Sequence, residues 1–290
     1  MANTNTSDSQ LLTNMLQEAV FTASEKMIAD KVFTTYNMAG TPGLTAQIPV
    51  YPEITAQTRN QTTEVSDTAF DVAQVDVTAA EIQARIDVSD LLAESTIRNM
   101  GADVGQMIGA AIGEKVDTDA FALFTETNVE QDVGDDNTDL TPDTLLQAVY
   151  TLRGQNAPTD GEGDYHCVLA PGQAYHLTKT LAGAGYGTSA NAISNVGNTL
   201  LSSSAYVGRL FNVKIFQSTA VVADSVATAK NGCVFSPTAF AHVIKRPLRI
   251  ESQRDISMRH TEYVGTVAVA SKTVKGSYAC RVKSKFAIEG

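Results

Sequence analysis

Apolar residues recur every three or four positions in two long stretches of the chain, which is the spacing of an amphipathic helix. Residues 8–33 form the first stretch, in which Met15, Ala19 and Ala23 share one face. Residues 89–127 form the second and stronger one, and Ser89 and Asp90 are suitable caps for its start. At about 1.5 Å per residue, the second stretch predicts a rod of about 60 Å.

Glycine recurs at every fourth position of the second helix, at Gly101, Gly105, Gly109 and Gly113. Helices that associate inside a membrane use this spacing, but the charged residues among the glycines, such as Asp103 and Glu114, exclude a membrane segment. In a water-soluble protein the glycine face predicts the close approach of a strand or sheet. Each glycine costs the helix about 1 kcal/mol of intrinsic propensity.

Between the two helices the pattern is that of extended strands. Residues 44–51 predict an edge strand, because Pro49 has no N–H to donate to a ladder. Residues 69–87 alternate apolar and polar positions with period two. Joined by the polar segment 52–68, they predict a long β-hairpin with little apolar surface, and such a hairpin is usually buried on a partner molecule.

Helices and strands alternate in the second half of the chain. Pro142 starts a predicted helix, a strand follows at 165–170, and Pro171 opens another helix. A loop is expected at 183–204, with strands at 206–217 and 232–235. From His242 to the C-terminus the pattern is that of strands. The sequence therefore predicts a compact α/β unit followed by a β-rich end.

Charge is distributed unevenly along a chain whose net charge is -11. Residues 1–140 carry 6 basic and 23 acidic side chains, whereas residues 141–290 carry 15 basic and 9 acidic ones. Parts of opposite sign favour head-to-tail contacts between copies, because complementary potentials steer an interface and set its register. Two independently solvated faces are the alternative. The overall acidity argues against a protein whose main activity is binding duplex nucleic acid.

The sequence offers no catalytic constellation. Its four histidines lie outside the known metal frames, and neither a GxSxG elbow nor a GxxxxGK[ST] phosphate loop occurs. Residues 183–187 contain three glycines but follow a predicted helix, so a flexible loop is preferred to a dinucleotide site. The acidic segment 130–137 lacks the spacing of a calcium loop. We therefore expect no enzymatic activity, no cofactor and no metal.

Targeting and redox signals are also missing. No apolar run approaches the length of a membrane span, and the polar N-terminus does not read as a signal peptide, so we expect a cytoplasmic protein without a membrane contact. The three cysteines are far apart and odd in number, which predicts buried thiols instead of disulfides or a zinc site: Cys167, Cys233 and Cys280.

The order of these elements resembles that of the Hong Kong 97-type (HK97-like) major capsid proteins of tailed bacteriophages. Residues 86–92, Ile-Asp-Val-Ser-Asp-Leu-Leu, are similar to the family's junction between extended loop and long helix. Residues 255–269 resemble its late strands, in which a charged irregular segment precedes a β-rich return, and residues 278–288 resemble its closing strand. The resemblance covers nearly the whole chain and rests on architecture.

The resemblance implies an α+β, HK97-like capsid fold and a division of the chain into four parts. Residues 1–40 would be an N-terminal arm and residues 41–88 an extended β-hairpin loop. The long spine helix and the peripheral domain would take residues 89–135 and 242–290. An α/β axial domain would take residues 136–241.

The same resemblance implies a structural protein of the virion capsid that is assembled in the host bacterial cytoplasm. Copies would self-assemble through hexamers and pentamers into the icosahedral head that encloses phage double-stranded DNA, without sequence-specific binding. Because the N-arm helix begins almost at residue 1, we expect a separate scaffolding protein. A portal protein is a further partner, and a decoration or cement protein is compatible with the fold. An encapsulin-type shell and an α/β enzyme are the alternatives, and the missing motifs count against the enzyme.

Contacts between copies are expected to be non-covalent, because segment 41–88 contains no lysine and only two basic residues, Arg59 and Arg85. We expect the acidic loop of one copy to lie over the basic C-terminal strands of a neighbour. The acidic candidates are Glu53, Glu64, Asp67, Asp71 and Asp76, and the basic candidates are Lys245, Arg246, Arg249, Lys283 and Lys285. Phosphate binding by the basic cluster 245–259 is the alternative interpretation.

Overall fold

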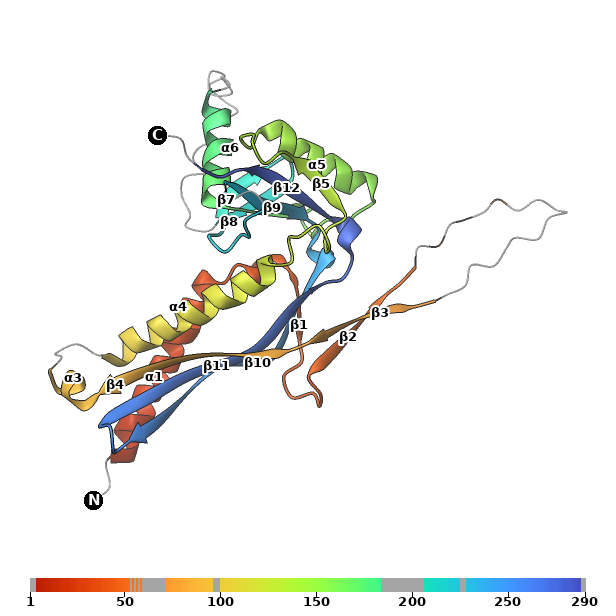
Figure 1. The fold of residues 1–290 in the computed structure, drawn as a ribbon. Coiled ribbons are helices and arrows are strands. Elements are labelled where there is room, and N and C mark those ends of the chain that lie inside the picture. The colour runs from red at the N-terminus through yellow and green to blue at the C-terminus, as the bar shows by residue number, and fades with distance from the viewer. Residues whose placement is uncertain are drawn as a thin grey trace.

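The computed structural model describes residues 4–52, 54, 56, 58, 71–95, 100–183, 206–224 and 228–287. Within these ranges an elongated body built on a four-stranded sheet adjoins a compact body built on a six-stranded sheet (Figure 1). A two-stranded hairpin projects from the elongated body. No helix in the described ranges has both the length and the hydropathy required to cross a membrane.

The four-stranded sheet has the order β1 (Thr34–Asn37), β10 (Phe240–Asp255), β11 (His260–Thr273) and β4 (Ala80–Ser89). β11 is antiparallel to both β10 and β4, whereas β1 runs parallel to β10. The register of β10 is irregular between Ile244 and Arg249. Pro247 lies within this stretch and cannot donate to a ladder, which accounts for the irregularity.

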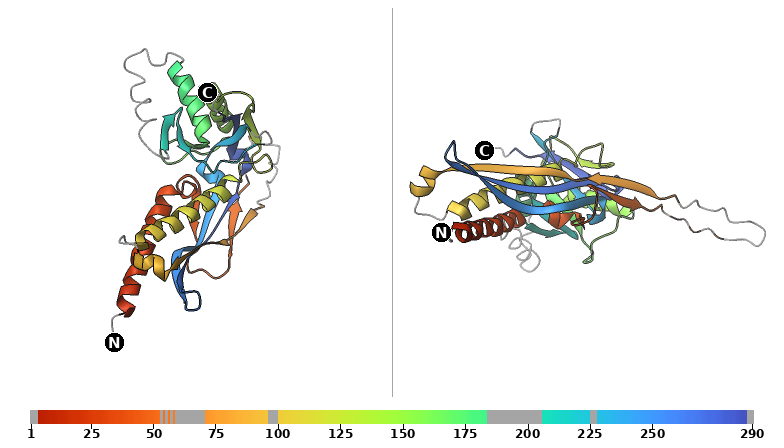
Figure 2. Two further views of the ribbon diagram at one scale, coloured as in Figure 1. Left: turned by 60° about the vertical axis from the view of Figure 1, so that its left-hand side comes forward. Right: turned by 90° about the horizontal axis from the view of Figure 1, so that it is seen from below.

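Helices α1 (Thr4–Lys26) and α4 (Met100–Phe121) run beside each other along this sheet (Figure 2). α4 contacts β11 and β4, and α1 contacts β10. The buried side chains Val104, Ile108 and Ile112 of α4 pack against apolar residues of the strands. The close fit requires a glycine in β11, because a Cβ on Gly265 would lie 2.3 Å from Ile108 Cγ2.

The glycine face of α4 meets a helix, not the strand or sheet that the sequence predicted. A Cβ on Gly105 would lie 2.5 Å from the backbone oxygen of Met15, and one on Gly109 would lie 2.3 Å from that of Ala19. Gly113 is less crowded, with Met27 Cγ at 3.4 Å. Glycines therefore let the backbone of α1 approach α4 closely, while the isoleucines of α4 face the sheet.

The predicted helix over 89–127 is shorter and interrupted. Asp90–Ser95 forms a separate short helix, α3, residues 96–99 lie outside the described residues, and α4 ends at Phe121. With 22 residues, α4 is about 33 Å long instead of the predicted 60 Å. Beyond Phe121 the backbone tightens, with Phe124 N donating to Phe121 O at 3.1 Å. This turn places both phenylalanines in a core cluster, so tertiary packing ends the helix.

The predicted helix over 8–33 is divided into α1 and a single-turn helix, α2 (Ala29–Val32). Asp117 of α4 is buried, and its carboxylate accepts the backbone N–H groups of Ile28 and Ala29 at 3.0 Å. Burial raises the pKa of Asp117 to about 6, although these hydrogen bonds oppose the shift. A carboxylate 88 positions away along the chain thus supports the start of α2.

Five phenylalanines form the junction between the two bodies. Phe33 precedes β1, Phe121 ends α4 and Phe124 follows it, Phe235 ends β9 (Ala229–Phe235), and Phe240 begins β10. The ring of Phe33 lies 4.9 Å from that of Phe240 and 5.4 Å from that of Phe235. Because all five are buried in one cluster, the segment that leads into β1 is part of the core that the two bodies share.

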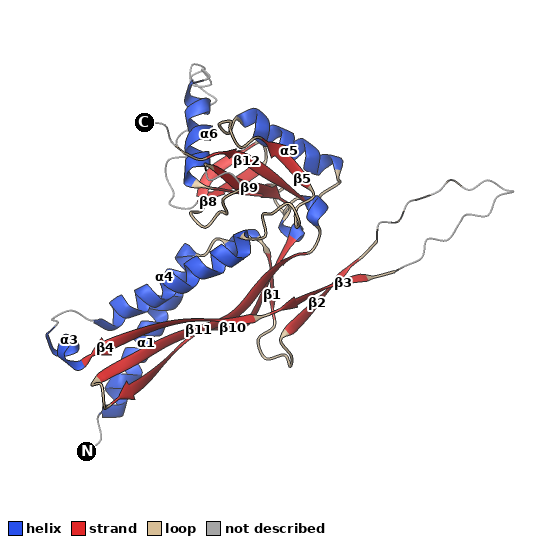
Figure 3. Ribbon diagram, in the orientation of Figure 1, coloured by secondary structure: helices blue, strands red, loops and turns tan. Residues whose placement is uncertain are grey.

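The six-stranded sheet includes strands that are far apart in the sequence, from residue 131 to residue 285. α5 (Pro142–Gly154) and α6 (Pro171–Gly183) lie beside it (Figure 3). The predicted strand over 206–217 is a hairpin, with Phe211 and Asn212 in the left-handed region at φ 53° and 63°. The order of the sheet is β5 (Gln131–Gly134), β12 (Ala279–Lys285), β9 (Ala229–Phe235), β6 (Tyr165–Leu169), β8 (Val213–Gln217) and β7 (Tyr206–Leu210).

The predicted boundary at residue 242, where the peripheral domain resumes, does not coincide with a change from one sheet to the other. β12 pairs with β9, and β5 pairs with β12, so two strands assigned to the peripheral domain lie in the sheet of the predicted axial domain. Cys280 and Val282 of β12 are buried in the same cluster as Leu145 of α5. The apolar face of β12 thus determines its sheet, and the four-part division of the chain stays a prediction.

The predicted hairpin is formed by β2 (Thr45–Val50) and β3 (Ala73–Thr78), which pair with no other strand of the described ranges. Pro49 therefore lies in an edge strand, as predicted. The base of the hairpin is anchored in its own chain, because Ile48 and Val77 are buried against Ala241 and Val243 of β10. The strand predicted over 69–87 is divided, and β4 joins the four-stranded sheet.

Candidate inter-subunit surfaces

Two of the five acidic contact candidates can be placed. Asp71 is exposed two residues before β3, and Asp76 is exposed within β3. Gln74 Nε2 donates to the Asp76 carboxylate at 3.3 Å, and Lys272 Nζ donates to the Asp76 backbone oxygen at 2.8 Å. The remaining three candidates lie outside the described residues: Glu53, Glu64 and Asp67.

The basic candidates of β10 lie near the base of the hairpin and have partners in their own chain. Lys245 Nζ donates to the backbone oxygens of Met38 and Thr41. Arg246 forms an ion pair with Glu81 at 2.8 Å. Arg249 lies 3.3 Å from Glu251, and both side chains are about half exposed or more, at 49% and 62%. Of these candidates, Arg249 is therefore the most available to a neighbouring copy.

The other two basic candidates lie on a different surface. Lys283 and Lys285 belong to β12, in the six-stranded sheet, and do not continue the basic stretch of β10. Lys283 Nζ lies 2.9 Å from the Asp132 carboxylate. The Lys285 backbone N–H donates to Thr138 O at 2.9 Å. The structure thus divides the predicted basic face into two separate groups.

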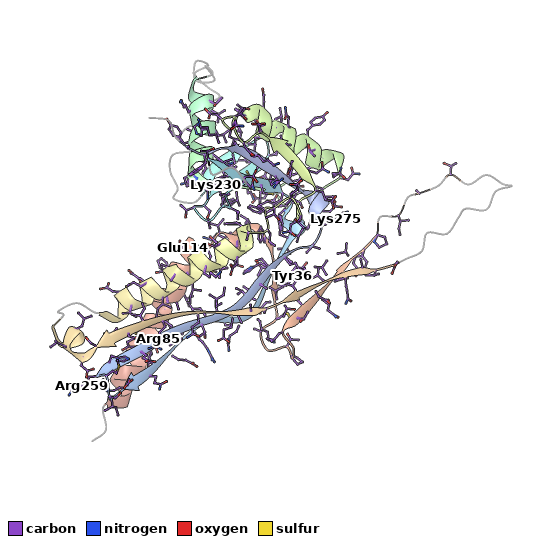
Figure 4. All side chains as sticks on the ribbon, viewed as in Figure 1. Tyr36, Arg85, Glu114, Lys230, Arg259 and Lys275 are labelled. Atoms are coloured by element: carbon purple, nitrogen blue, oxygen red, sulfur yellow. The ribbon has the colours of Figure 1, made fainter. Side chains whose placement is uncertain are left out.

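Arg254 and Arg259 hold the end of the elongated body together. The Arg254 guanidinium donates twice to the Asp90 carboxylate, at 2.9 and 2.8 Å. Arg259, which is labelled at this end of the molecule in Figure 4, places its Nε 3.6 Å from the same carboxylate. These pairs lower the pKa of Asp90, the hydrogen bond from Arg254 most of all. Between the two arginines, Ile256 and Met258 are 81% and 69% exposed. The β10–β11 turn therefore exposes two apolar side chains between arginines that are held by ion pairs with Asp90.

The hairpin also exposes large apolar residues, a feature that the charge pattern of the sequence does not indicate. Leu44, Tyr51 and Ile54 are 57%, 63% and 70% exposed. The even spacing of large side chains in 44–54 is visible in the sequence, but only the fold shows that β10 buries Ile48 and leaves these three side chains open. Large apolar side chains exposed together mark surfaces that associate.

Three histidines, His166, His176 and His242, and all three cysteines are buried, whereas His260 is partly exposed and lies 3.3 Å from Glu262. His166 Nδ1 donates to Val32 O at 2.9 Å, which ties α2 to β6. The three cysteines are free and buried, as predicted, and burial raises the pKa of each thiol. Protonated, buried thiols are poor nucleophiles. The residues 184–187 of the glycine-rich segment lie outside the described residues.

Asp160, Glu162 and Asp164 place ligand atoms within 4.8 Å of one another, close enough to bind a cation. Lys214 Nζ already lies 2.7 Å from both Asp160 and Glu162, and Arg209 lies 2.6 Å from Asp164. Burial would raise the pKa of Asp160, but hydrogen bonds from Lys214 and from the loop backbone lower it below its usual range. The three carboxylates are therefore already paired with two cations of the same chain.

The solved structures that resemble this fold include phage capsids and an encapsulin shell. No family model and no curated protein matches the sequence. Among solved structures, the chain is similar to the capsid of Ralstonia phage GP4, with a TM-score of 0.68, 10% identity, and coverage of 89% of this chain and 88% of that one. It is also similar to the capsid of cyanophage P-SCSP1u, with a TM-score of 0.63, 14% identity, and coverage of 88% and 87%. A third similar structure is the SrpI encapsulin of Synechococcus elongatus PCC 7942, with a TM-score of 0.59, 10% identity, and coverage of 90% and 88%.

These likenesses extend over nearly the full length of each chain. The fold is therefore the HK97-like fold of phage capsid proteins, as the order of elements in the sequence predicted. The same fold is found in the encapsulin shell.

Proposed function

We propose that this chain is the major capsid protein of a tailed bacteriophage and assembles through hexamers and pentamers into an icosahedral head around double-stranded DNA. The observation that carries the proposal is the structural similarity of nearly the whole chain to the capsids of several phages. Almost the same share of this chain and of each similar chain is covered. A subunit of this shape has its function in contacts with copies of itself. In this role it needs no catalytic residues.

The proposed mechanism is closed assembly through repeated heterologous contacts, in which the hairpin of one copy lies over a neighbour. The acidic positions on the hairpin, including Asp71 and Asp76, would face Arg249 and its neighbours on β10. Arg246 and Lys245 would exchange internal partners for external ones. Each exposed pair contributes about 0–1 kcal/mol, so the contact depends on repetition around the shell and on the exposed Tyr51 and Ile54.

The proposal includes further partners. A separate scaffolding protein would direct curvature, a portal protein would occupy one vertex, and a decoration protein is compatible with the outer surface. DNA would be enclosed without sequence recognition, and assembly would occur in the cytoplasm of the bacterial host. The acidity of the chain supports weak binding of DNA, since a surface without strong positive charge does not bind phosphates tightly.

Negative-stain electron microscopy tests the proposal, on the protein expressed alone and with a scaffolding protein from the same gene cluster. We expect capsomers or irregular assemblies alone, and closed shells with the scaffold. A protein that stays monomeric in both conditions would refute the capsid function. Regular closed shells formed by the protein alone would refute the need for a scaffold.

Charge reversal tests the proposed contact. We expect Arg249→Glu to reduce the yield of shells at least about tenfold while the subunit remains folded, because like charges then face each other at every copy of the contact. Lys179→Glu on α6 is the control, since it makes the same change in charge away from β10. Normal shell yields from the Arg249 variant would contradict the proposed contact and leave the capsid function standing.

An encapsulin-type compartment is the second candidate, supported by the similarity to the SrpI shell. The contents of purified native shells distinguish the two functions. Double-stranded DNA inside supports the phage head, whereas a packaged protein in place of DNA supports the compartment.

A further inference from the structure

Two carboxyl groups and one carboxamide from separate segments meet beside the six-stranded sheet. Asp136 lies two residues after the end of β5, Asn231 lies within β9, and Asp224 lies in the segment that precedes β9. Asn231 Nδ2 donates to Asp224 Oδ1 at 3.3 Å, and a side-chain hydrogen bond joins Asp224 to Asp136. Asp224 therefore contacts both of the other side chains.

Backbone pairing brings these segments together. β12 lies between β5 and β9 (Figure 1), and Lys283 of β12 pairs with Gly134 on one side and with Asn231 on the other. Gly134 has a φ of 91°, and a Cβ there would collide with the Lys283 backbone oxygen, so the chain leaves β5 by a turn that requires glycine. The Asn231 N–H donates to Val222 O at 3.0 Å, which holds the segment before β9 beside the strand.

Two oxygens of this cluster are buried acceptors. Asp136 Oδ1 and Asn231 Oδ1 have no hydrogen-bond partner within the part of the chain that the structure describes. Asn231 is only 3% exposed, and its amide nitrogen is directed at Asp224, so the end of this side chain lies in the cluster. Because buried polar atoms are normally paired, these two oxygens indicate a ligand that interacts with acceptors.

The charges of the cluster indicate a positive ligand. Burial, the hydrogen bond with Asp224 and the repulsion between the two carboxylates raise the pKa of Asp136. Lys283 acts on Asp136 and Arg281 acts on Asp224, but both cations are in direct contact with Asp132. Among the described residues no lysine or arginine forms an ion pair with Asp136.

A bound cation accounts for these features together. A proton shared between Asp136 and Asp224 would relieve their repulsion, but it would leave Asn231 Oδ1 without a partner. A water molecule would donate to both open oxygens and leave the two carboxylates facing each other. A divalent cation offsets the two negative charges and is bound by carboxylate and amide oxygens, which are the ligands that calcium and magnesium prefer.

We propose that Asp136, Asp224 and Asn231 form a binding site for a hard divalent cation, calcium or magnesium. Water molecules complete the coordination, because both ions take six or more oxygen ligands. The bound ion fastens the segment after β5 to β9 and to the segment before it, across β12. The acidic segment 130–137 supplies only one of the three ligands, so the spacing within it gives no sign of this site. The proposal concerns the single subunit and does not depend on shell formation.

Isothermal titration calorimetry tests the proposal on the unassembled full-length protein after treatment with a chelator. Calcium chloride and magnesium chloride are titrated separately, at an ionic strength kept constant with sodium chloride so that general screening does not change. The site variants are Asp136→Asn and Asp224→Asn, which remove one charge each and keep the size of the side chain. The matched control is Glu162→Gln, which removes one charge from the Asp160–Asp164 cluster. Circular dichroism checks that all variants are folded.

We expect the wild type to bind about one ion per chain with a Kd of about 10⁻⁴–10⁻³ M, because only two carboxylates contribute. Both site variants should bind at least about tenfold more weakly, and Glu162→Gln should bind like the wild type. Thermal unfolding gives a second readout. In chelator Asp136→Asn should melt above the wild type, because the repulsion is relieved, whereas added calcium should stabilise the wild type and not the variant.

Four results would overturn the proposal. The first is the absence of saturable binding of either ion by the wild type up to about 10 mM, ten times the weakest expected Kd. The second is equal binding by the site variants and the wild type, and the third is loss of binding in Glu162→Gln, which would place the ion in the other cluster. The fourth is equal stabilisation of Asp136→Asn and the wild type by calcium.

Discussion

Two alanine substitutions in α4 should change stability in opposite directions. A Cβ on Gly109 would lie 2.3 Å from the backbone oxygen of Ala19 and 2.9 Å from its Cα. On Gly113 the nearest atoms would be Met27 Cγ at 3.4 Å and the Ala23 oxygen at 3.5 Å, which are ordinary contacts. The same substitution in the same helix therefore clashes with a backbone at Gly109 and makes ordinary van der Waals contacts at Gly113.

The magnitudes follow from the two competing effects. Alanine is better than glycine in a helix by about 1 kcal/mol, and Gly113→Ala should gain most of it. In Gly109→Ala this gain is opposed by overpacking, which costs about 1–3 kcal/mol. The upper end applies because α1 must move away by about 1 Å as a whole, since a backbone oxygen cannot rotate aside as a side chain can. The expected net loss is about 2 kcal/mol, and the two variants should differ by about 3 kcal/mol.

Urea unfolding of the unassembled protein at one fixed concentration measures both variants. Limited proteolysis provides a local measurement, because Gly109→Ala should release α1 before the sheet unfolds. Gly105→Ala should behave like Gly109→Ala, since its Cβ would lie 2.5 Å from the Met15 oxygen. If Gly109→Ala is as stable as the wild type, or if both variants shift in the same direction, then the helix pair is not packed as described and the reasoning is refuted.

Two further predictions concern buried charges. Burial raises the pKa of Asp117 to about 6, so the folded state binds the proton of this carboxyl more tightly than the unfolded state does. As the pH falls from 7.5 to 4.5, the wild type should therefore gain about 1–3 kcal/mol of stability relative to Asp117→Asn. Urea midpoints of both proteins at the two pH values measure this, and a difference that does not vary with pH would contradict it. Arg281 is 3% exposed and forms a bidentate pair with Asp132, so Asp132→Ala should cost about 3–5 kcal/mol by leaving a buried guanidinium poorly compensated. Arg281→Met should cost less, because Lys283 still pairs with Asp132 at 2.9 Å, and the reverse order of urea midpoints would count against this account.

The positions of the main elements and the fold class follow from local sequence signals. Apolar periodicity predicted both long helices, Pro49 predicted an edge strand, and the spacing of the cysteines predicted buried thiols. Their order along the chain was sufficient to identify the HK97-like fold, which similarity to phage capsids confirms. These signals act within a few residues, so a single sequence displays them directly.

What the sequence alone did not determine is which distant groups meet. The face of Gly105 and Gly109 indicated a close approach, but only the tertiary structure decided that α1 makes it. The break before α2 depends on a carboxylate 88 positions away, and the end of α4 depends on an aromatic cluster drawn from four parts of the chain. The internal partners of Arg246, Arg254 and Lys283 likewise depend on long-range pairing. The physical reason is that packing and ion pairing are set by three-dimensional neighbours, whereas helix and strand periodicity is set by the neighbours in sequence.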